Sequence, residues 1–525
     1  MSLVRERSSF PEGFTRRRKT MVKKSTTPGF TLQAARRPGI PGAARAFLLL
    51  ALLPLTAAAQ GGGRPPSPLG GSDFYPFGGL GAEGDVLAAK KERVPGIPPK
   101  AGVLRIRKVY PGGPAEKAGL HPGDLIYGAG RKIFPGKGLD ACLDAFEKAL
   151  ERAEAKAPGK LVLLVLRDGK RTKVTVRVRV LGSHSGTCPE KCRKCRKILE
   201  EALAYLLSSQ QKDGSWNTPL GGLNGKVAVT SLAGRALVWG RGLGLYTDKA
   251  VSKALDFVLK RAGRDPMMEA MRSRAKGANW SQVNWSLAYA IQFAATAAKG
   301  KAPSRARKKI AEWIRELAEN QEKSGGWGHG PGGPNALGYV ELEIMSNQVL
   351  LGWALAGRSG LELPREALKK AVAYVDACTG GDGGTAYSTR PGQIGFGDPG
   401  RTAGAWLALD LLGMGKKRPK MFKFFYNRMD ELPSGHVSPV MHILAAAMAT
   451  RRKGKRYFHA FWKRYRPYLM VSRTEKGAFG AMPTRESRTL HSNTDRGMGP
   501  AWITASFALV LEAGMGRIGW LTGKR

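Results

Sequence analysis

The chain has 525 residues, and its 86 lysines and arginines outnumber 40 aspartates and glutamates, which gives a formal net charge of +46 at pH 7. No apolar stretch reaches the length of about 18 residues that a membrane-spanning helix needs, so a bundle of such helices is excluded. A charge of this size favours an anionic partner.

The amino-terminal segment 1–60 has the features of a targeting sequence. Basic residues precede an apolar core within 46–60, and the segment ends in small residues, Ala57-Ala-Ala59. This pattern predicts a secretory signal and an exported protein of the periplasm or cell envelope. A start at Met21 and an uncleaved anchor are alternatives. The Gly- and Pro-rich residues 61–85 are predicted to be a linker.

Residues 86–182 predict a small α+β domain. A strand, a turn, a short helix and a second strand are expected over 102–134, and a longer helix over 139–153. Residues 160–180 alternate as a β-hairpin does, with its turn at Asp168-Gly169.

The motif GGPAEKAGLHPGDLI, residues 112–126, resembles a PDZ domain of the bacterial periplasmic kind. The resemblance implies that an extended or C-terminal peptide adds to a strand edge and that backbone N–H groups hold its carboxylate. The implied groove residues are Gly102, Val103, Leu104, Ile106, Leu139, Leu143 and Phe146. The alternative is a degenerate domain that only packs on its neighbour.

Residues 183–525 repeat one pattern six times: a basic amphipathic helix, a polar loop and an Ala-rich apolar helix. The apolar helices are expected to begin near Val227, Ser281, Tyr339, Gly400, Val437 and Gly499. A helix that is apolar on every face must be enclosed by its neighbours. We therefore predict an all-α (α/α)6 toroid of about twelve helices, with the apolar helices inside.

Two of the loops, Gln211–Trp216 and Gln321–Trp327, resemble the QW-type repeat of terpenoid cyclases and prenyltransferases. Glycine would make the tight turn, the aromatic ring would fill the gap between helix pairs, and glutamine would cap helix ends. The order of PDZ domain, Cys-Pro joint and toroid resembles an uncharacterised family of exported bacterial proteins. Terpenoid or prenyl chemistry is disfavoured, because the sequence has no Asp-x-Asp-Asp acid and no evident zinc ligand set.

Candidate catalytic residues are expected where loops enter the inner helices, at the mouth of the ring. Asp398 and Arg401 precede one tryptophan as Asp495 and Arg496 precede another. Arginine can hold a carboxylate or phosphate, and histidine can move protons near neutral pH. The candidates are His329, His436, His491, Asp398, Asp495, Arg401 and Arg496, and further polar residues at equivalent places are Gln282, Asn284, Glu341, Glu343, His442 and Asn493. The alternative is that these residues cap helices and pair with one another.

Five cysteines are present: Cys142, Cys188, Cys192, Cys195 and Cys378. Cys188, Cys192 and Cys195 have the spacing of a radical-SAM cluster, which is rejected because no βα-barrel pattern follows. A metal site of these three with His184 is one interpretation. A disulfide or plain cysteines at a helix start are favoured over it, so the sequence analysis assigns no metal ligand and no cofactor.

Residues 451–468 carry the densest basic patch, interleaved with aromatic residues. On an exported protein an anionic polysaccharide or surface suits this patch better than nucleic acid, and a solvated helix face is the alternative.

The favoured function is an exported scaffold whose PDZ domain binds a protein tail. The alternative is an envelope lyase or hydrolase of an acidic polysaccharide. Convergence of the candidate histidines and aspartates on one site would favour the enzyme.

Overall fold

The described part of the chain lies within one compact unit, residues 64–525. The computed structural model describes residues 74–87, 94–266, 281–297, 304–331, 341–484, 487 and 493–522. The predicted targeting segment 1–60 and His491 lie outside these residues. Among the described helices, none combines the length and the apolar character that crossing a bilayer requires.

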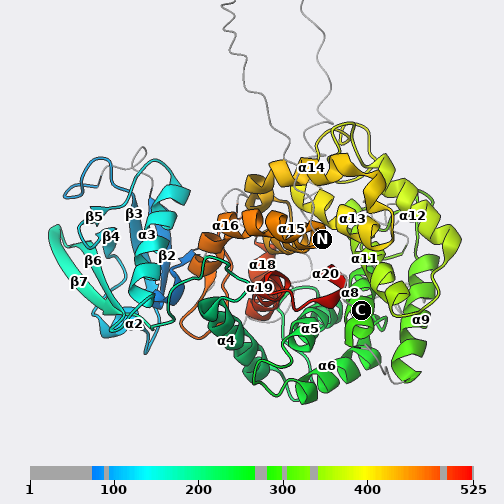
Figure 1. The fold of residues 1–525 in the computed structure, drawn as a ribbon, viewed down its shortest axis with the longest axis horizontal. Coiled ribbons are helices and arrows are strands. Elements are labelled where there is room, and N and C mark those ends of the chain that lie inside the picture. The colour runs from blue at the N-terminus through cyan, green and yellow to red at the C-terminus, as the bar shows by residue number, and fades with distance from the viewer. Residues whose placement is uncertain are drawn as a thin grey trace, which may run out of the picture. The chain divides into compact units, whose positions relative to one another are not determined.

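A sheet domain comes first (Figure 1). Its strands pair antiparallel in the order β1-β2-β3-β4-β6-β7, with β5 beside β4, and two helices accompany them. The bounds are β1 Tyr75–Pro76, β2 Ala82–Leu87, β3 Val103–Val109, α2 Pro114–Lys117, β4 Leu125–Ala129, β5 Lys132–Ile133, α3 Leu139–Glu154, β6 Lys160–Arg167 and β7 Lys170–Arg177.

The predicted hairpin is confirmed, because Asp168 and Gly169 both have positive φ, 48° and 76°, between β6 and β7. The predicted linker over 61–85 is wrong at its carboxyl end, where β1 and most of β2 belong to the sheet. Gly84 explains the error. A Cβ atom there would lie 1.9 Å from the carbonyl oxygen of Arg105, so the strand needs a glycine that resembles linker sequence.

The helical domain alternates outer and inner helices (Figure 1). The outer helices are α4 Arg193–Ser209, α6 Asp248–Arg261, α9 Ser304–Glu319, α12 Arg365–Ala377, α14 Pro419–Asn427 and α16 Lys455–Ser472. The inner helices are α5 Gly222–Trp239, α8 Val283–Ala297, α11 Glu343–Arg358, α13 Pro399–Leu411, α15 Pro439–Lys453 and α19 Pro500–Gly514.

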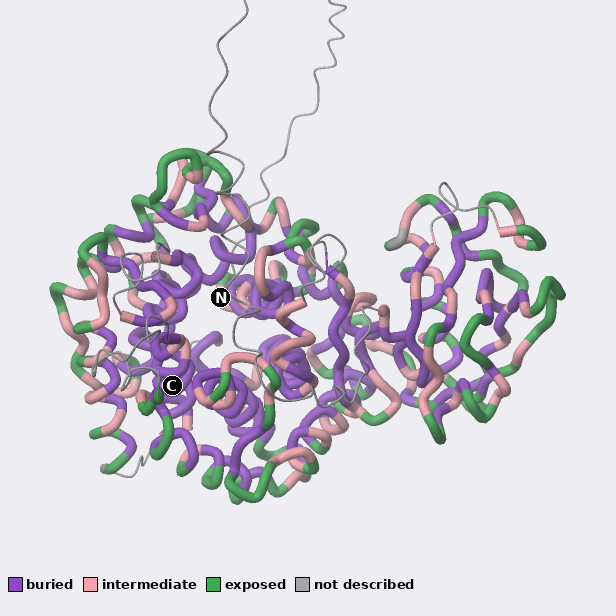
Figure 2. The backbone as a smooth tube through the Cα atoms, turned by 180° about the vertical axis from the view of Figure 1, so that it is seen from behind, coloured by how far each residue is buried: buried purple, intermediate pink, exposed green. Residues whose placement is uncertain are grey.

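The inner helices are buried on nearly every face, as their composition predicts. In α19, every residue from Ala501 to Gly514 is buried. Figure 2 shows the same distribution, with buried backbone at the centre of the ring and exposed turns at its rim.

The predicted number of about twelve helices is too low. The described residues contain sixteen α-helices, including two in the sheet domain and the short α18 Thr494–Met498 and α20 Gly519–Thr522.

The loop between an outer and an inner helix is built alike in the two clearest repeats. The indole N–H of Trp216 donates to the carbonyl of Leu206, at 2.9 Å, and that of Trp327 donates to the carbonyl of Leu317, at 2.7 Å. Both rings are completely or almost completely buried. Each tryptophan therefore closes the end of its own outer helix while it fills the space beneath the loop.

The glutamine of the repeat joins one helix pair to the next. The side-chain amide of Gln321 donates to the carbonyl of Gly325 in its loop and to that of Ala367 in the following outer helix, at 2.8 and 2.9 Å. Gln210 makes the same two kinds of bond, both at 2.9 Å. The predicted capping of a helix end is seen at Gln211, whose side-chain amide donates to the carbonyl of Ser209 at the end of α4, at 3.2 Å.

The ring closes on itself. In the first loop, Gly214 has φ +88° and lies so close to α6 that a Cβ would be 2.3 Å from the carbonyl oxygen of Lys253. In the last loop, Gly477 has φ +81° and approaches the carbonyl oxygen of Glu201 in α4 in the same way, at 2.9 Å. The inner helix α19 also packs against α4 and α5. The last repeat therefore meets the first, as a toroid requires.

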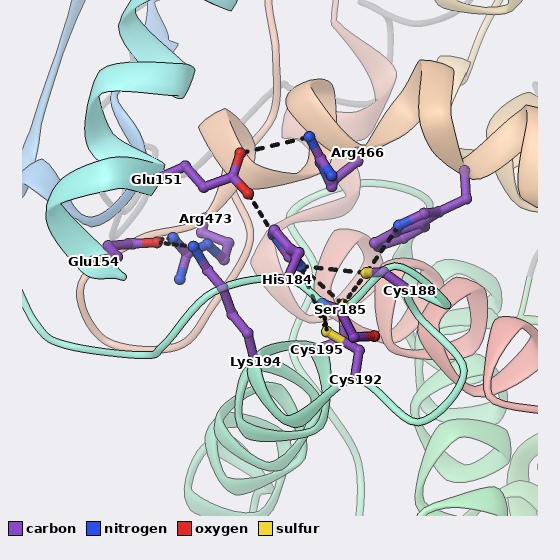
Figure 3. A network of polar contacts seen from close by, with 11 residues as sticks. Glu151, Glu154, His184, Ser185, Cys188, Cys192, Lys194, Cys195, Arg466 and Arg473 are labelled. Atoms are coloured by element: carbon purple, nitrogen blue, oxygen red, sulfur yellow. Dashed lines mark hydrogen bonds and ion pairs between the residues drawn. The ribbon is translucent and has the colours of Figure 1, made fainter. Parts of the chain in front are cut away.

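The sheet domain shares its core with the toroid. Val471 and Met482, from the end of α16 and the loop after it, belong to the same buried cluster as Phe146 and Leu150 of α3. Close by, the buried carboxylate of Glu154 binds Lys194 and Arg473, and this contact is drawn in Figure 3. The two domains are thus joined by both apolar packing and a buried ion-pair network.

Candidate functional site

Titratable side chains gather at the amino-terminal ends of α11, α13 and α15. Asp398 caps α13, where its carboxylate accepts a hydrogen bond of 2.8 Å from the backbone N–H of Arg401. The sequence Asp-Pro at a helix start favours this geometry, since proline suits the first helical position. The other face of Asp398 meets His442 of α15, with Oδ1 and Nδ1 3.4 Å apart.

Glu343 begins α11 and is fully buried. The amide of Asn347 donates to its Oε2 at 3.4 Å, whereas its Oε1 and the Nε of Arg401 have no hydrogen-bond partner among the described residues. Burial raises the pKa of Glu343 to about 8, against the opposing effect of Arg401. A buried carboxyl that keeps its proton at neutral pH is a suitable general acid.

The pKa of Asp398 is shifted in the opposite direction, downward. Burial alone would raise its pKa, but His442, Arg401 and two backbone N–H donors lower it below the ordinary value. Its side chain remains 14% exposed, so the cluster reaches the surface at this residue. Two interacting carboxyl groups with opposite pKa shifts are characteristic of acid–base sites.

Aromatic packing encloses the cluster. The ring of Tyr387 lies 5.6 Å from the guanidinium of Arg401 and 5.4 Å from the ring of His436. The backbone N–H of Glu343 donates to the carbonyl of Tyr387 at 3.0 Å. Tyr387 and His436 are partly exposed. We call Glu343, Asp398, Arg401 and His442 the carboxyl cluster.

The remaining catalytic candidates lie elsewhere. His329 accepts a hydrogen bond from the indole of Trp285 at 2.8 Å, and burial lowers its pKa to about 4, so it is neutral. Asp495 of α18 receives a hydrogen bond from Ser438 and another, of 3.1 Å, from the backbone N–H of Val440. It therefore holds the start of α15.

Arg496 lines a different cleft, between the sheet domain and the toroid. That cleft is also lined by Tyr110, whose hydroxyl donates to Glu83 at 2.8 Å. Of the seven candidates, Asp398 and Arg401 belong to the carboxyl cluster and His436 lies beside it against Tyr387, whereas His329, Asp495 and Arg496 lie elsewhere and His491 is outside the described residues. Glu343 and His442 are predicted only as further polar residues. An acidic residue at the first position of an otherwise apolar helix, as at Glu343, could have indicated a functional carboxyl group.

The residues implied for a peptide groove do not present an open strand. Leu104 of β3 pairs with Val86 of β2 on one side and with Ile126 of β4 on the other. Leu104 and Ile106 are completely buried in the sheet domain. A peptide therefore has no free backbone edge to join along this part of β3, and Leu143 and Phe146 of α3 form core rather than a groove wall.

The basic patch 451–468 is largely engaged within the molecule. Arg452 binds Asp410 at 2.7 Å, and Lys455 binds Glu190 at 2.8 Å. Arg466 lies 3.5 Å from Glu151 of α3, and Arg451 donates to the carbonyl of Ala513 at 3.0 Å. Much of this charge therefore supports the packing of α15 and α16.

A second cluster lies at the joint between the two domains (Figure 3). His184 precedes α4, Cys188 and Cys192 lie in the turn before it, and Cys195 is in its first turn. One ligand atom from each residue lies within 4.8 Å of all the others. The cysteine spacing favours a disulfide or plain helix-start cysteines, and spacing alone does not show that His184 lies against the three thiols.

Known proteins resemble parts of the chain. Drimenyl diphosphate synthase of Streptomyces showdoensis is 29% identical over 204 residues, which is 38% of this chain and 34% of that protein. The chain thus matches about a third of this relative's length.

Two solved structures also resemble the chain. An inactive variant of an α-1,6-mannanase of Salegentibacter, in complex with α-1,6-mannotriose, has a TM-score of 0.45 and 9% identity, and covers 62% of this chain and 99% of its own. Cellobiose 2-epimerase of Spirochaeta thermophila has a TM-score of 0.43 and 14% identity, and covers 62% and 97%.

The family model described as "Domain of unknown function (DUF6288)" matches residues 196–512, more than half of the sequence and most of the toroid, and the chain belongs to this family.

Proposed function

We propose that this protein is an enzyme that cleaves an acidic polysaccharide by acid–base chemistry at the carboxyl cluster. The observation that carries the proposal is the divergence of two interacting carboxyl groups: burial holds the pKa of Glu343 at about 8, while the pKa of Asp398 is lowered. At neutral pH one therefore keeps its proton and the other is ionised, which assigns an acid and a base.

The cluster has the parts that cleavage of a glycosidic bond needs. Glu343 would give a proton to the leaving oxygen, and Asp398, backed by His442, would accept one. In hydrolysis that proton comes from water, whose oxygen forms the new bond to the sugar. In elimination it comes from the carbon beside a carboxylate, and the C–O bond breaks to leave a double bond. Arg401 would hold the substrate carboxylate.

Three further features support the substrate class and location. Among the described residues, the buried Oε1 of Glu343 and Nε of Arg401 have no hydrogen-bond partner, so each keeps bonding capacity that a substrate could use. The net charge of +46 attracts polyanions over a long range. The apolar core within residues 46–60, preceded by basic residues, supports an envelope location, where such polymers are met.

The test uses purified chain with acidic and neutral polysaccharides, and follows reducing ends together with the ultraviolet absorbance of unsaturated products. The informative variant is Asp398→Asn, because asparagine caps a helix as well as aspartate does and removes only the base. We expect the rate to fall by roughly 100- to 10,000-fold with the fold retained. Glu343→Gln should give a similar loss.

The matched control is Glu512→Gln. Glu512 is a fully buried carboxyl with a raised pKa in another inner helix, outside the carboxyl cluster. It should keep wild-type activity. If Asp398→Asn remains fully active, or if Glu512→Gln loses as much activity as Glu343→Gln, the proposed roles are wrong.

A second candidate is chemistry on an isoprenoid diphosphate, and it is favoured by the similarity to drimenyl diphosphate synthase. Arg401 could hold a diphosphate in place of a carboxylate. The absence of an Asp-x-Asp-Asp motif from the sequence counts against it. Turnover of an isoprenoid diphosphate, lost in Asp398→Asn while every polysaccharide stays intact, would replace the first proposal.

A further inference from the structure

His184, Cys188, Cys192 and Cys195 form a ligand set that neither the family description nor the proposed function assigns. We propose that these four residues bind one zinc ion, which fixes the sheet domain to the toroid. Three thiolates and one imidazole are a common ligand set of structural zinc sites. The spacing from His184 is three residues, three residues and two residues, short enough for one turn to enclose the ion.

The distances from the histidine nitrogen to the three sulfurs fit tetrahedral zinc. The Nδ1 of His184 lies 3.3, 3.7 and 3.4 Å from the sulfurs of Cys188, Cys192 and Cys195. Bonds of about 2.3 Å to sulfur and about 2.0 Å to nitrogen place such atoms about 3.5 Å apart around a tetrahedral ion. The sulfurs of Cys188 and Cys195 are 3.0 Å apart, beyond the roughly 2.0 Å of a disulfide bond.

The surroundings stabilise thiolates. The indole N–H of Trp462 in α16 donates to the sulfur of Cys188 at 3.1 Å, and the backbone N–H of Ser185 donates to that of Cys192 at 3.4 Å. All three cysteines are buried. N–H donors to sulfur and exclusion of water are the usual supports of zinc–thiolate sites.

The imidazole is oriented from the other domain. The Nε2 of His184 faces the carboxylate of Glu151 in α3, 3.8 Å away, which leaves Nδ1 directed at the three sulfurs (Figure 3). A carboxylate behind a histidine ligand fixes the ring and increases its basicity. Glu151 belongs to the sheet domain and Trp462 to the toroid, so the site is supported from both.

Zinc is favoured over other metals by the ligands. Three thiolates and an imidazole suit zinc, whereas calcium and magnesium require oxygen ligands. The four protein ligands would occupy all four coordination positions of a tetrahedral zinc ion and leave none for substrate. The site is therefore structural, and it is independent of the carboxyl cluster.

The test measures zinc in full-length chain that is purified under reducing conditions and then freed of loosely bound metal. We expect about one zinc per chain in the wild type and less than about a tenth of that in Cys195→Ser. The matched controls are Cys142→Ser and Cys378→Ser, which change buried free cysteines elsewhere and should keep about one zinc per chain.

Substitution with cobalt tests the site in the wild-type chain, so the result does not depend on whether a cysteine variant folds. Replacement of zinc by Co²⁺ in the wild-type chain should give the intense visible bands of tetrahedral cobalt and the ultraviolet band of thiolate ligation. A strong chelator should lower the melting temperature of the wild type.

Three results would overturn the proposal: wild-type chain with no zinc after supplementation, a disulfide between Cys188 and Cys195 found by mapping, or visible absorption of an iron–sulfur cluster. Wild-type chain that holds zinc but cleaves no acidic polysaccharide would instead contradict only the proposed function.

Discussion

Glu343 shows how one buried carboxyl links stability to pH. Its pKa rises from an ordinary value of 4.5 to about 8 because the folded chain removes it from water. Between these values the unfolded chain has lost the proton that the folded chain still binds. Folding is therefore weakened as pH rises through this window, by roughly 1.4 kcal/mol per pH unit for this group.

Glu343→Gln removes this dependence, since the amide does not ionise. We expect the variant to gain stability relative to the wild type as pH rises from about 4.5 to about 8, with no further change above that range. Melting temperatures of both proteins at several pH values measure it. A constant difference across the window would show that Glu343 titrates normally, and it would weaken the assignment of Glu343 as the acid.

At the scale of elements, the Gln–Gly–Trp loops act as joints between helix pairs. Gln321 bonds its own loop and the following outer helix at once, and the indole of Trp327 closes the preceding one. Each repeat is thereby tied to the next through hydrogen bonds from side chains of the loop to backbone carbonyls of the two outer helices.

Gln321→Ala should destabilise the toroid by about 1–3 kcal/mol, because two backbone carbonyls lose their donor. Gln211→Ala is the control: Gln211 is exposed and bonds only to its own helix end, so its loss should change stability by less than about 0.5 kcal/mol. Chemical denaturation measures both. Equal effects at the two positions would mean that the first repeat uses Gln211 after all.

Local pattern predicted these elements well and their side-chain roles less well. An all-apolar composition identified the inner helices, because no other environment suits such a helix. Two adjacent glutamines, Gln210 and Gln211, are indistinguishable by composition, so the sequence did not show that Gln210 bonds to the next outer helix. The carboxyl cluster depends on how α11, α13 and α15 pack side by side, and the thiol cluster depends on how the chain turns between His184 and Cys195. Asp398 and His442 are neighbours only because the consecutive inner helices α13 and α15 pack against each other.

At the scale of the whole molecule, the packing of the helical domain depends on closure of the ring, in which the last repeat packs on the first. The contact that closes it is the approach of Gly477 to Glu201 of α4, where a Cβ would lie 2.9 Å from a carbonyl oxygen. Because Gly477 has φ +81°, any other residue meets both backbone strain and this contact.

Gly477→Ala tests ring closure. Its control is Gly244→Ala, which places alanine in the same left-handed backbone conformation. Gly244 also has φ +81°, but a Cβ there would meet nothing within 4 Å. Both substitutions should cost about 1–2 kcal/mol from the left-handed conformation. Gly477→Ala should cost about 1–3 kcal/mol more, from the clash with α4. Equal losses in denaturation experiments would show that this junction is looser than the structure indicates.

The shared core between Phe146 and Val471 has a consequence for biosynthesis. The sheet domain leaves the ribosome first, yet the apolar surface that completes its core belongs to residues more than three hundred positions later. A nascent chain would therefore carry an unfinished domain until Val471 and Met482 have been made. Holdase chaperones that bind exposed apolar surface would be expected to associate with it throughout that interval.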